Sequence, residues 1–253
     1  MPMPTERVPF VGVGFDLLTM DEVLSRLGAI TAESPYSYLV TPNVDHVVRL
    51  DDPAQGPELK PLYEDADLSL CDSRIIAHLG RLRGLSLPVV PGSDLTQRLF
   101  DRVIKAGDRI AVVGGDRDMV ADLGRRYPGV ELIHNEPPMG LRRDQAARGE
   151  VARFIAQTRA RFTFIAVGSP QQEMIAGAVR AYPGATGMAL CIGASLDFIT
   201  LRQRRAPPLM QNLSLEWVHR LASDPKRMWR RYLVEGPRIF LLAARQDRDT
   251  EAS

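Results

Sequence analysis

The chain has 253 residues, of which 45% are hydrophobic, so it can bury a substantial core. It contains no run of 18 or more apolar residues, which excludes a transmembrane helix, and its first residues lack the basic region and long apolar core of a secretory signal. Its two cysteines, Cys71 and Cys191, form neither a disulfide framework nor a CxxC zinc motif. We therefore expect a cytoplasmic protein in which both thiols are reduced and buried.

The net charge of +1 conceals an asymmetry between the two ends of the chain. Residues 202–248 hold 11 basic and 4 acidic residues, whereas the rest of the chain has 21 basic and 27 acidic residues. A basic tail on an acidic body favours a polyanionic partner, which is a phosphate, a nucleic acid or an anionic membrane surface. A solvated helical face would have the same composition, so charge alone leaves these alternatives open.

Short apolar segments that end in Gly, Pro or Asn alternate with helical patterns along the chain. Predicted strands cover residues 38–41, 109–113, 131–134, 162–167 and 188–192, and predicted helices cover 95–105, 119–126, 143–160 and 171–181. The helix at 95–105 is expected to begin after a Ser93-Asp94 cap. Because the strands are apolar on both faces, the pattern predicts an α/β fold, a Rossmann-like, mainly parallel sheet with flanking helices.

The pattern changes after residue 203, which divides the chain into an α/β domain (1–203) and a helical C-terminal appendage (204–253). Ser214 is expected to cap one helix, Asp224-Pro225 to begin a second, and Gly236-Pro237 to end it and begin a third. Arginines and aromatic residues are interleaved here, a mixture that suits a membrane interface. They are Trp217, Arg220, Arg227, Trp229, Arg230, Arg231 and Tyr232.

Polar and glycine residues follow four of the predicted strands, where ligands bind in open α/β sheets. Glycine turns let a ligand approach the backbone, and amides at the start of a helix can bind phosphate. Each residue also has a structural explanation, such as capping the next helix or lying on its surface. The candidates are Thr41, Asn43, Gly114, Gly115, Gly168, Ser169, Gln172, Gly193 and Asp197.

Asp72 ends the apolar stretch 68–71. A carboxylate in that position is expected to be partly desolvated, which would raise its pKa and suit a general base, although an aspartate there is also typical of a helix cap. The tripeptide Asp65-Ala66-Asp67 has the form of a DxD metal motif, but such pairs recur by chance in this aspartate-rich chain. We assign no metal.

In this order, the motifs resemble those of the WecG/TagA/CpsF family of bacterial glycosyltransferases over residues 11–242. The most specific segments are 168–173 (GSPQQE, like GSPxQE), 193–198 (GASLDF, like GxSFDF), 205–207 (RAP), and 215–221 followed by 224–232, which are similar to LEWxxRLxxEPxRxxRRY. Upstream, residues 41–43, Asp72, 92–95 and 114–115 match TxN, the aspartate of DG, GxDL and GG. Ser73 replaces the glycine of DG, and Ile199-Thr200 replaces an Ala-Gly pair.

The resemblance implies an inverting transfer, independent of metal and cofactor, of a hexose or N-acetylhexosamine from a UDP-sugar to a polyprenyl-diphosphate-linked sugar in cell-surface polysaccharide synthesis. By this resemblance Asp72 is the catalytic base, while Thr41, Asn43 and Gln172 surround the reacting sugars. Asp197 and the glycine turns lie on the nucleotide side. Arg220, Arg227 and Arg230 belong to an appendage that closes over the site at the inner face of the cell membrane, where the protein would be peripheral.

Two other functions fit parts of the sequence. A nucleotide- or NAD-binding Rossmann enzyme would share the strand and glycine pattern, but the chain lacks GxGxxG and an acidic residue about 20 positions later. A nucleic-acid binding protein would use the basic tail. The polar strand ends favour an enzyme that binds no nucleic acid, and homo-oligomerisation stays open.

Overall fold

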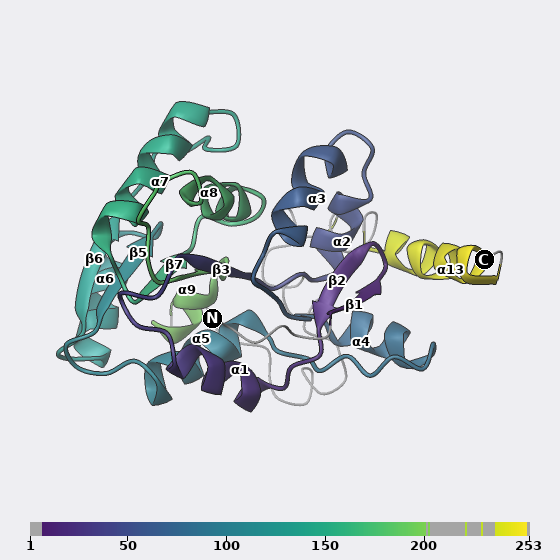
Figure 1. Ribbon diagram of the computed structural model, residues 1–253, viewed down its shortest axis with the longest axis horizontal. Coiled ribbons are helices and arrows are strands. Elements are labelled where there is room, and N and C mark those ends of the chain that lie inside the picture. Colours follow the sequence, from purple (N-terminus) through teal and green to yellow (C-terminus); the bar gives the residue numbers. More distant parts are fainter. Residues whose placement is uncertain (1–6, 201, 203–220, 222–228, 230–235, 252–253) are drawn as a thin grey trace.

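The computed structural model describes residues 7–200, 202, 221, 229 and 236–251, and the side chains of these as far as Arg245. Six parallel strands form the central sheet in the order β4-β3-β8-β7-β5-β6. They are β3 (Ser37–Val40), β4 (Leu68–Ser69), β5 (Arg109–Val113), β6 (Glu131–Asn135), β7 (Phe162–Ile165) and β8 (Met188–Cys191). The predicted Rossmann-like α/β sheet is confirmed (Figure 1).

Helices cover both faces of the sheet. One layer holds α2 (Val44–Leu50), α3 (Gly56–Glu64), α7 (Gln145–Thr158) and α8 (Gln171–Val179), and the other holds α1 (Met20–Gly28), α5 (Gly92–Arg102), α6 (Arg117–Arg126) and α9 (Ser195–Ile199). Figure 1 shows α7, α8 and α3 on one side of the strands and α1, α5 and α9 on the other. Alternate residues of the four central strands β3, β8, β7 and β5 enter two separate cores, which explains why these strands are apolar on both faces.

Residues that pair in register on neighbouring strands point their side chains to the same face of the sheet and so into the same core. In β3, Val40 packs into the core beneath α2 and α8, whereas Leu39 packs into the core on the α5 side. Cys191 pairs in register with Val40, and Ile165 pairs with Cys191. The carboxyl ends of these three strands therefore lie side by side at one edge of the sheet.

A two-stranded antiparallel hairpin that the sequence patterns did not indicate precedes the sheet. It consists of β1 (Arg7–Phe10) and β2 (Val13–Asp16), and its buried residues Phe10 and Phe15 join the core that contains α2 and α3. Helix α4 (Arg74–Arg81) follows β4 and adds Ile76 to the same core.

The prediction that Ser93-Asp94 caps the helix of 95–105 is wrong. Helix α5 begins at Gly92, its N-cap is Pro91, and no side chain caps it. The chain leaves the sheet earlier than the cap motif suggested, because the Val90 N–H donates to the Cys71 carbonyl at 2.8 Å and Pro91 turns the backbone immediately afterwards.

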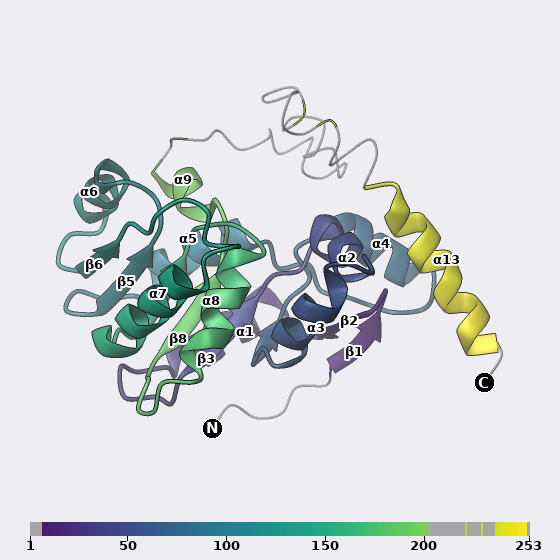
Figure 2. The same ribbon diagram turned by 90° about the horizontal axis from the view of Figure 1, so that it is seen from above.

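Helix α13 (Arg238–Glu251) begins where Gly236-Pro237 predicted the third helix of the appendage. Ile239 and Ala243, each 1% exposed, pack into the core shared with α2, while Phe240 and Leu241 face outward. Figure 2 shows α13 beside α2 and α4, at the end of the molecule away from β6. The first two predicted appendage helices and the boundary at 203/204 lie in or beside the part of the chain outside the described residues, so they stay predictions.

Candidate active site

Thr41 and Asp72 follow the carboxyl ends of the neighbouring strands β3 and β4. Thr41 is 5% exposed and its hydroxyl donates to the Cys191 carbonyl at 3.4 Å, which ties the end of β3 to the end of β8. The Asp72 N–H donates to the Pro42 carbonyl at 3.1 Å, so Asp72 lies beside the segment that carries Thr41. Asp72 is half-buried.

Asp72 does not cap the next helix, since Ser73 does. The Ser73 hydroxyl accepts from the Ile76 N–H at 3.3 Å at the start of α4. The residue that replaces the glycine of the DG motif thus takes the capping role, which leaves the Asp72 carboxylate outside the cap. The elevated pKa expected for Asp72 stays a prediction.

Asn43 has the structural role that its position also allowed. Its side-chain oxygen accepts from the backbone N–H groups of Asp45 and His46, at 3.1 and 3.4 Å, and so caps α2. The cap uses the carbonyl oxygen of the amide and holds the side chain at the edge of the sheet next to Thr41.

The Gly114-Gly115 turn needs glycine at both positions. Their φ angles are +94° and +70°. A Cβ on Gly114 would lie 2.9 Å from Val167 Cγ1, and one on Gly115 would lie 2.1 Å from Met119 Cε. The turn therefore packs directly against the end of β7, and Asp116 after it caps α6 by accepting from Met119 N–H at 2.7 Å.

The turn of Gly168 and Ser169 is linked to α2 by a residue that the sequence motifs did not single out. The Arg49 guanidinium donates to the Ser169 hydroxyl at 3.0 Å and to the Asp45 carboxylate at 2.6 Å. Asp45 and Arg49 are four residues apart on α2, and this helical spacing is the only sequence signal for the pair. Gly168 has φ +79°, and apart from its chain neighbours no atom of the described residues lies within 4 Å of where its Cβ would be.

Gln172 is buried, with 2% of its surface exposed, so it is not a surface helix residue. Its side-chain oxygen accepts from the Gly193 N–H at 2.8 Å, and its NH₂ group donates to the Glu173 carboxylate at 2.8 Å. Glu173 is fully buried and, although it belongs to the 168–173 motif, sequence reasoning gave it no role.

Asp197 lies on α9, on the side of the site near α6. Partial burial raises its pKa, the Arg202 guanidinium opposes that effect, and the Asp116 carboxylate adds to it. Arg202 forms a 2.7 Å ion pair with Asp116, and Arg126 donates to the Ile199 carbonyl at 2.7 Å. Both contacts fasten α9 and the residues after it to α6.

The two thiols are buried, as the sequence predicted. Burial raises the pKa of Cys71 to about 12, and burial together with the nearby Glu173 carboxylate raises the pKa of Cys191 well above its usual value. Both remain protonated at neutral pH, so neither has the thiolate character of a nucleophile.

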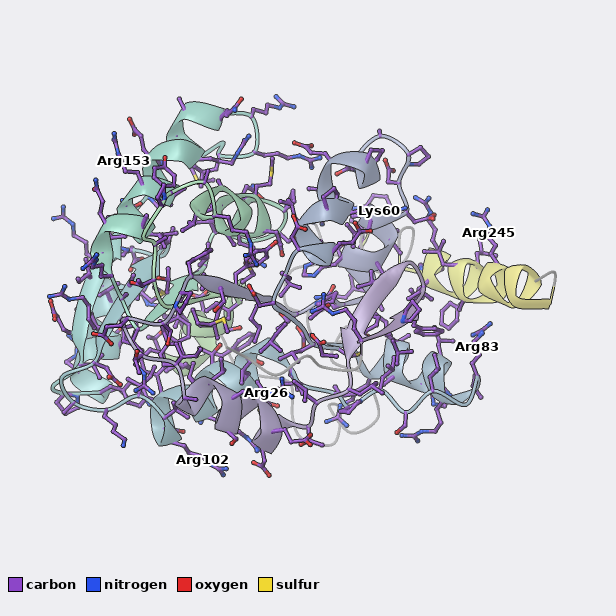
Figure 3. The ribbon with its side chains drawn as sticks, viewed as in Figure 1. Arg26, Lys60, Arg83, Arg102, Arg153 and Arg245 are labelled. Atoms are coloured by element: carbon purple, nitrogen blue, oxygen red, sulfur yellow. The ribbon has the colours of Figure 1, made fainter. Side chains whose placement is uncertain are left out.

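The DxD tripeptide lies away from this edge. Asp67 precedes β4, at the amino end of the strand, where its carboxylate accepts from the Tyr38 N–H at 2.8 Å and from Arg180 at 2.6 Å. Among the described residues no group of three or more His, Cys, Asp or Glu side chains is placed to hold a metal ion. Figure 3 shows the labelled basic side chains of Arg83, Arg102, Arg153 and Arg245 at the margins of the molecule.

The structure therefore brings together, at the carboxyl edge of one sheet, most of the residues that the sequence singled out. Thr41, Asp72 and Asn43 lie at the ends of β3 and β4, and the glycine turns follow β5, β7 and β8. Arg220, Arg227 and Arg230 lie outside the described residues. In open α/β sheets ligands bind at the carboxyl ends of the strands, so this edge of the Rossmann-like sheet is the candidate ligand site.

A family model supplies the class of reaction. The model of the glycosyl transferase WecG/TagA/CpsF family matches residues 8–253, nearly the whole chain. The protein belongs to this family and is a glycosyltransferase of cell-surface polysaccharide synthesis. In the part of the chain that the structure describes, no helix is long and apolar enough to cross a membrane.

Proposed function

We propose that this enzyme transfers a hexose or N-acetylhexosamine from a UDP-sugar to a polyprenyl-diphosphate-linked sugar, with inversion of the anomeric centre. The observation that carries the proposal is the arrangement of the sheet edge in a member of this glycosyltransferase family. Asp72 and Thr41 occupy the β4–β3 side, and the glycine turns after β5, β7 and β8 occupy the other. The proposed base for the acceptor and the proposed donor-binding turns thus lie on one edge of the sheet.

In this reaction Asp72 accepts the proton of the acceptor hydroxyl. The hydroxyl oxygen forms a bond to the anomeric carbon of the donor, and the bond between that carbon and the UDP oxygen breaks, so UDP leaves from the opposite face. Thr41 and Asn43 lie beside Asp72 and are proposed to contact the reacting sugars. The donor nucleotide would occupy the side of Gly114, Gly115 and Asp197.

The diphosphate of the departing UDP needs positive charge or hydrogen-bond donors. Backbone N–H groups at the start of α8 are suitable donors, because amides at helix starts favour anions. At α6 the Asp116 carboxylate already accepts from the Met119 N–H, and the Gly114 N–H donates to the Asn135 carbonyl. We propose that Arg220, Arg227 and Arg230 of the appendage supply the positive charge, since guanidinium groups bind phosphate oxygens strongly and stabilise developing charge without a metal ion.

A polyprenyl acceptor also requires access to a membrane surface, and α13 has the apolar surface for this. Phe240 is 56% exposed and Leu241 62% exposed, while their neighbours Ile239 and Ala243 hold the helix against α2. Trp229 is 51% exposed. We propose peripheral attachment of this end to the anionic inner leaflet, with the basic residues of 202–248 adding electrostatic attraction of about 1 kcal/mol each near the surface.

Co-sedimentation with anionic vesicles tests this attachment. Replacing Phe240 and Leu241 together by Ser should lower the bound fraction several-fold, because two exposed apolar side chains no longer enter the interface. Met139→Ser is the matched control, since Met139 is 98% exposed and lies on the loop between β6 and α7. Equal binding of both variants would contradict attachment through α13.

The reaction itself is tested by release of UDP from UDP-sugars in the presence of synthetic prenyl-diphosphate sugars. Asp72→Asn should lower turnover about 10²–10⁴-fold, the usual contribution of a general base, while the fold is kept. Asp21→Asn, which neutralises an aspartate with an 82% exposed side chain, is the control. A folded Asp72→Asn enzyme that turns over within a few-fold of the wild type would refute the assignment. Turnover that is abolished by EDTA and restored by Mn²⁺ or Mg²⁺ would refute metal independence.

A further inference from the structure

Glu173 and Gln172 form a buried pair beneath the Gly193 turn. Glu173 is 0% exposed, and one of its carboxylate oxygens accepts from the Gln172 NH₂ group at 2.8 Å. Its other oxygen is buried and has no hydrogen-bond partner among the described residues. A carboxylate this deep in the protein is costly unless its donors are held in place, so the Gln172 NH₂ group is needed where it lies.

The pair fixes the orientation of the Gln172 amide. A carboxylate only accepts hydrogen bonds and a backbone N–H only donates them. Gln172 lies between the two, so only one orientation satisfies both neighbours, with its NH₂ group toward Glu173 and its oxygen toward the Gly193 N–H at 2.8 Å. With its NH₂ group engaged by Glu173, the Gln172 amide keeps its oxygen on the Gly193 N–H, which holds the turn after β8.

The groups around Glu173 do not compete for this arrangement. The pKa of Tyr63 is raised well above its usual value, by burial first and by the Glu173 carboxylate second, and the pKa of Cys191 is raised by the same two causes. Both side chains therefore stay neutral at physiological pH.

The Gly193 turn is the part of the site that this pair supports. Gly193 has φ +55°, and apart from its chain neighbours no atom of the described residues lies within 4 Å of where its Cβ would be, so the described part of the chain does not cover this side of the backbone. The turn follows Cys191, whose carbonyl accepts from Thr41, and precedes α9, which carries Asp197. A shift of the backbone at Gly193 would thus displace the end of β8, which contacts Thr41, and the start of α9, which carries Asp197.

We infer that Glu173 and Gln172 act as positioning residues, which hold the Gly193 turn in the conformation that accepts the donor substrate. The inference rests on the proposed function for the identity of that substrate. Gln172 acts on the substrate indirectly, by holding Gly193, because its side chain is buried and both ends of its amide are hydrogen-bonded within the protein.

Exchanging the two side chains separates positioning from direct catalysis. In the double variant Gln172→Glu/Glu173→Gln, the carboxylate introduced at position 172 still accepts from the Gly193 N–H, and the amide introduced at position 173 donates to that carboxylate. Volume, charge and both hydrogen bonds are therefore kept, whereas the carboxamide at position 172 is lost. Gln172→Met keeps the volume but removes both hydrogen bonds, and Gln171→Met makes the same change one residue earlier as the control.

Amide hydrogen exchange at Gly193 is the first measurement and needs no ligand. Gln172→Met should speed it about 10-fold or more, as expected for loss of one well-formed hydrogen bond, while the exchanged pair and Gln171→Met should keep the wild-type rate. UDP binding by calorimetry and UDP release should follow the same order, with a weaker affinity in Gln172→Met that the exchanged pair restores.

Three results would overturn the inference or its basis, and each is distinct. Unchanged Gly193 exchange in Gln172→Met would show that the pair does not hold the turn. Restored exchange and UDP affinity without restored turnover, in the exchanged pair, would show that the Gln172 carboxamide acts on the substrate itself. A wild-type protein that binds no UDP would refute the proposed donor, and the exchange measurement would still decide whether the pair holds the turn.

Discussion

Asp16 is predicted to be the main anchor between the N-terminal hairpin and the strand that leads to Asp72. Its side chain is fully buried and forms a 2.9 Å ion pair with Arg7. The same carboxylate accepts from the Ser69 N–H at 2.6 Å, in β4. Arg7 also donates to the Ala66 carbonyl at 2.9 Å, so the pair joins β1, β2 and the start of β4.

Asp16→Asn is the informative change because it keeps the shape and removes the charge. Arg7 Nη2 and the Ser69 N–H both donate to Asp16 Oδ2, and Arg7 Nε donates to Oδ1 at 3.3 Å, so an amide at position 16 must present its NH₂ group to at least one Arg7 donor. Breaking one partner of a buried ion pair costs about 3–5 kcal/mol. Because the Arg7 side chain is 26% exposed and partly screened by water, we expect about 3 kcal/mol, a large part of the roughly 5–15 kcal/mol that stabilises a typical domain.

Urea denaturation measures the free energy of unfolding of Asp16→Asn, of Arg7→Gln and of the double variant. If the pair interacts as the distances indicate, the double variant should lose clearly less stability than the two single variants together. Asp21→Asn should change stability by less than about 0.5 kcal/mol, because its side chain is 82% exposed. A loss below about 1 kcal/mol in Asp16→Asn would refute the reasoning.

Three further predictions follow from single contacts. Cys71, whose pKa burial raises to about 12, should resist alkylation at pH 8 in the folded protein and react after unfolding; rapid native labelling would contradict its burial. The hydrogen bond from Arg202 is the main cause that lowers the pKa of Asp116 in the folded protein. The Asp116 carboxylate therefore stabilises the fold at pH values above the pKa that it has in the unfolded chain, and this contribution is lost as the pH falls through its lower pKa in the folded protein. Arg202→Ala should raise the pKa of Asp116, as NMR titration of the carboxyl carbon would show, and an unchanged pKa would exclude the ion pair in solution. Gly187→Ala should destabilise the protein by at least about 2 kcal/mol in urea unfolding, since φ is +82° and a Cβ would lie 2.0 Å from the Ala160 carbonyl oxygen; a neutral variant would show that the backbone relaxes.

Local sequence patterns were sufficient for much of the sheet. Residues 109–113 were predicted as a strand and form β5 with the same bounds, and the predicted helix at 171–181 corresponds to α8, Gln171–Val179. Such segments are determined by their own apolar runs and by the Gly or Pro residues that end them. The ordered motifs were equally local, and the family match over residues 8–253 confirmed them.

Elements that are stabilised by partners far away in the chain could not be predicted from the sequence patterns. The hairpin of β1 and β2 is held to the body of the protein by Asp16, whose partner Ser69 is 53 residues away. β4 has only two residues and owes its place in the sheet to parallel pairing with β3. No window along the chain contains both members of such pairs, so no periodicity can reveal them.

The chain itself thus determined the fold class, the family and the set of polar residues at the strand ends. Tertiary structure alone decided which of those residues cap helices and which support a turn: Ser73 rather than Asp72 caps α4, Asn43 caps α2, and the buried Gln172 holds Gly193. The reason is physical. Capping depends on where each helix begins. Burial depends on which distant segment packs over a side chain: Gln172 is covered by the turn after β8, whose Gly193 lies 21 positions later in the sequence.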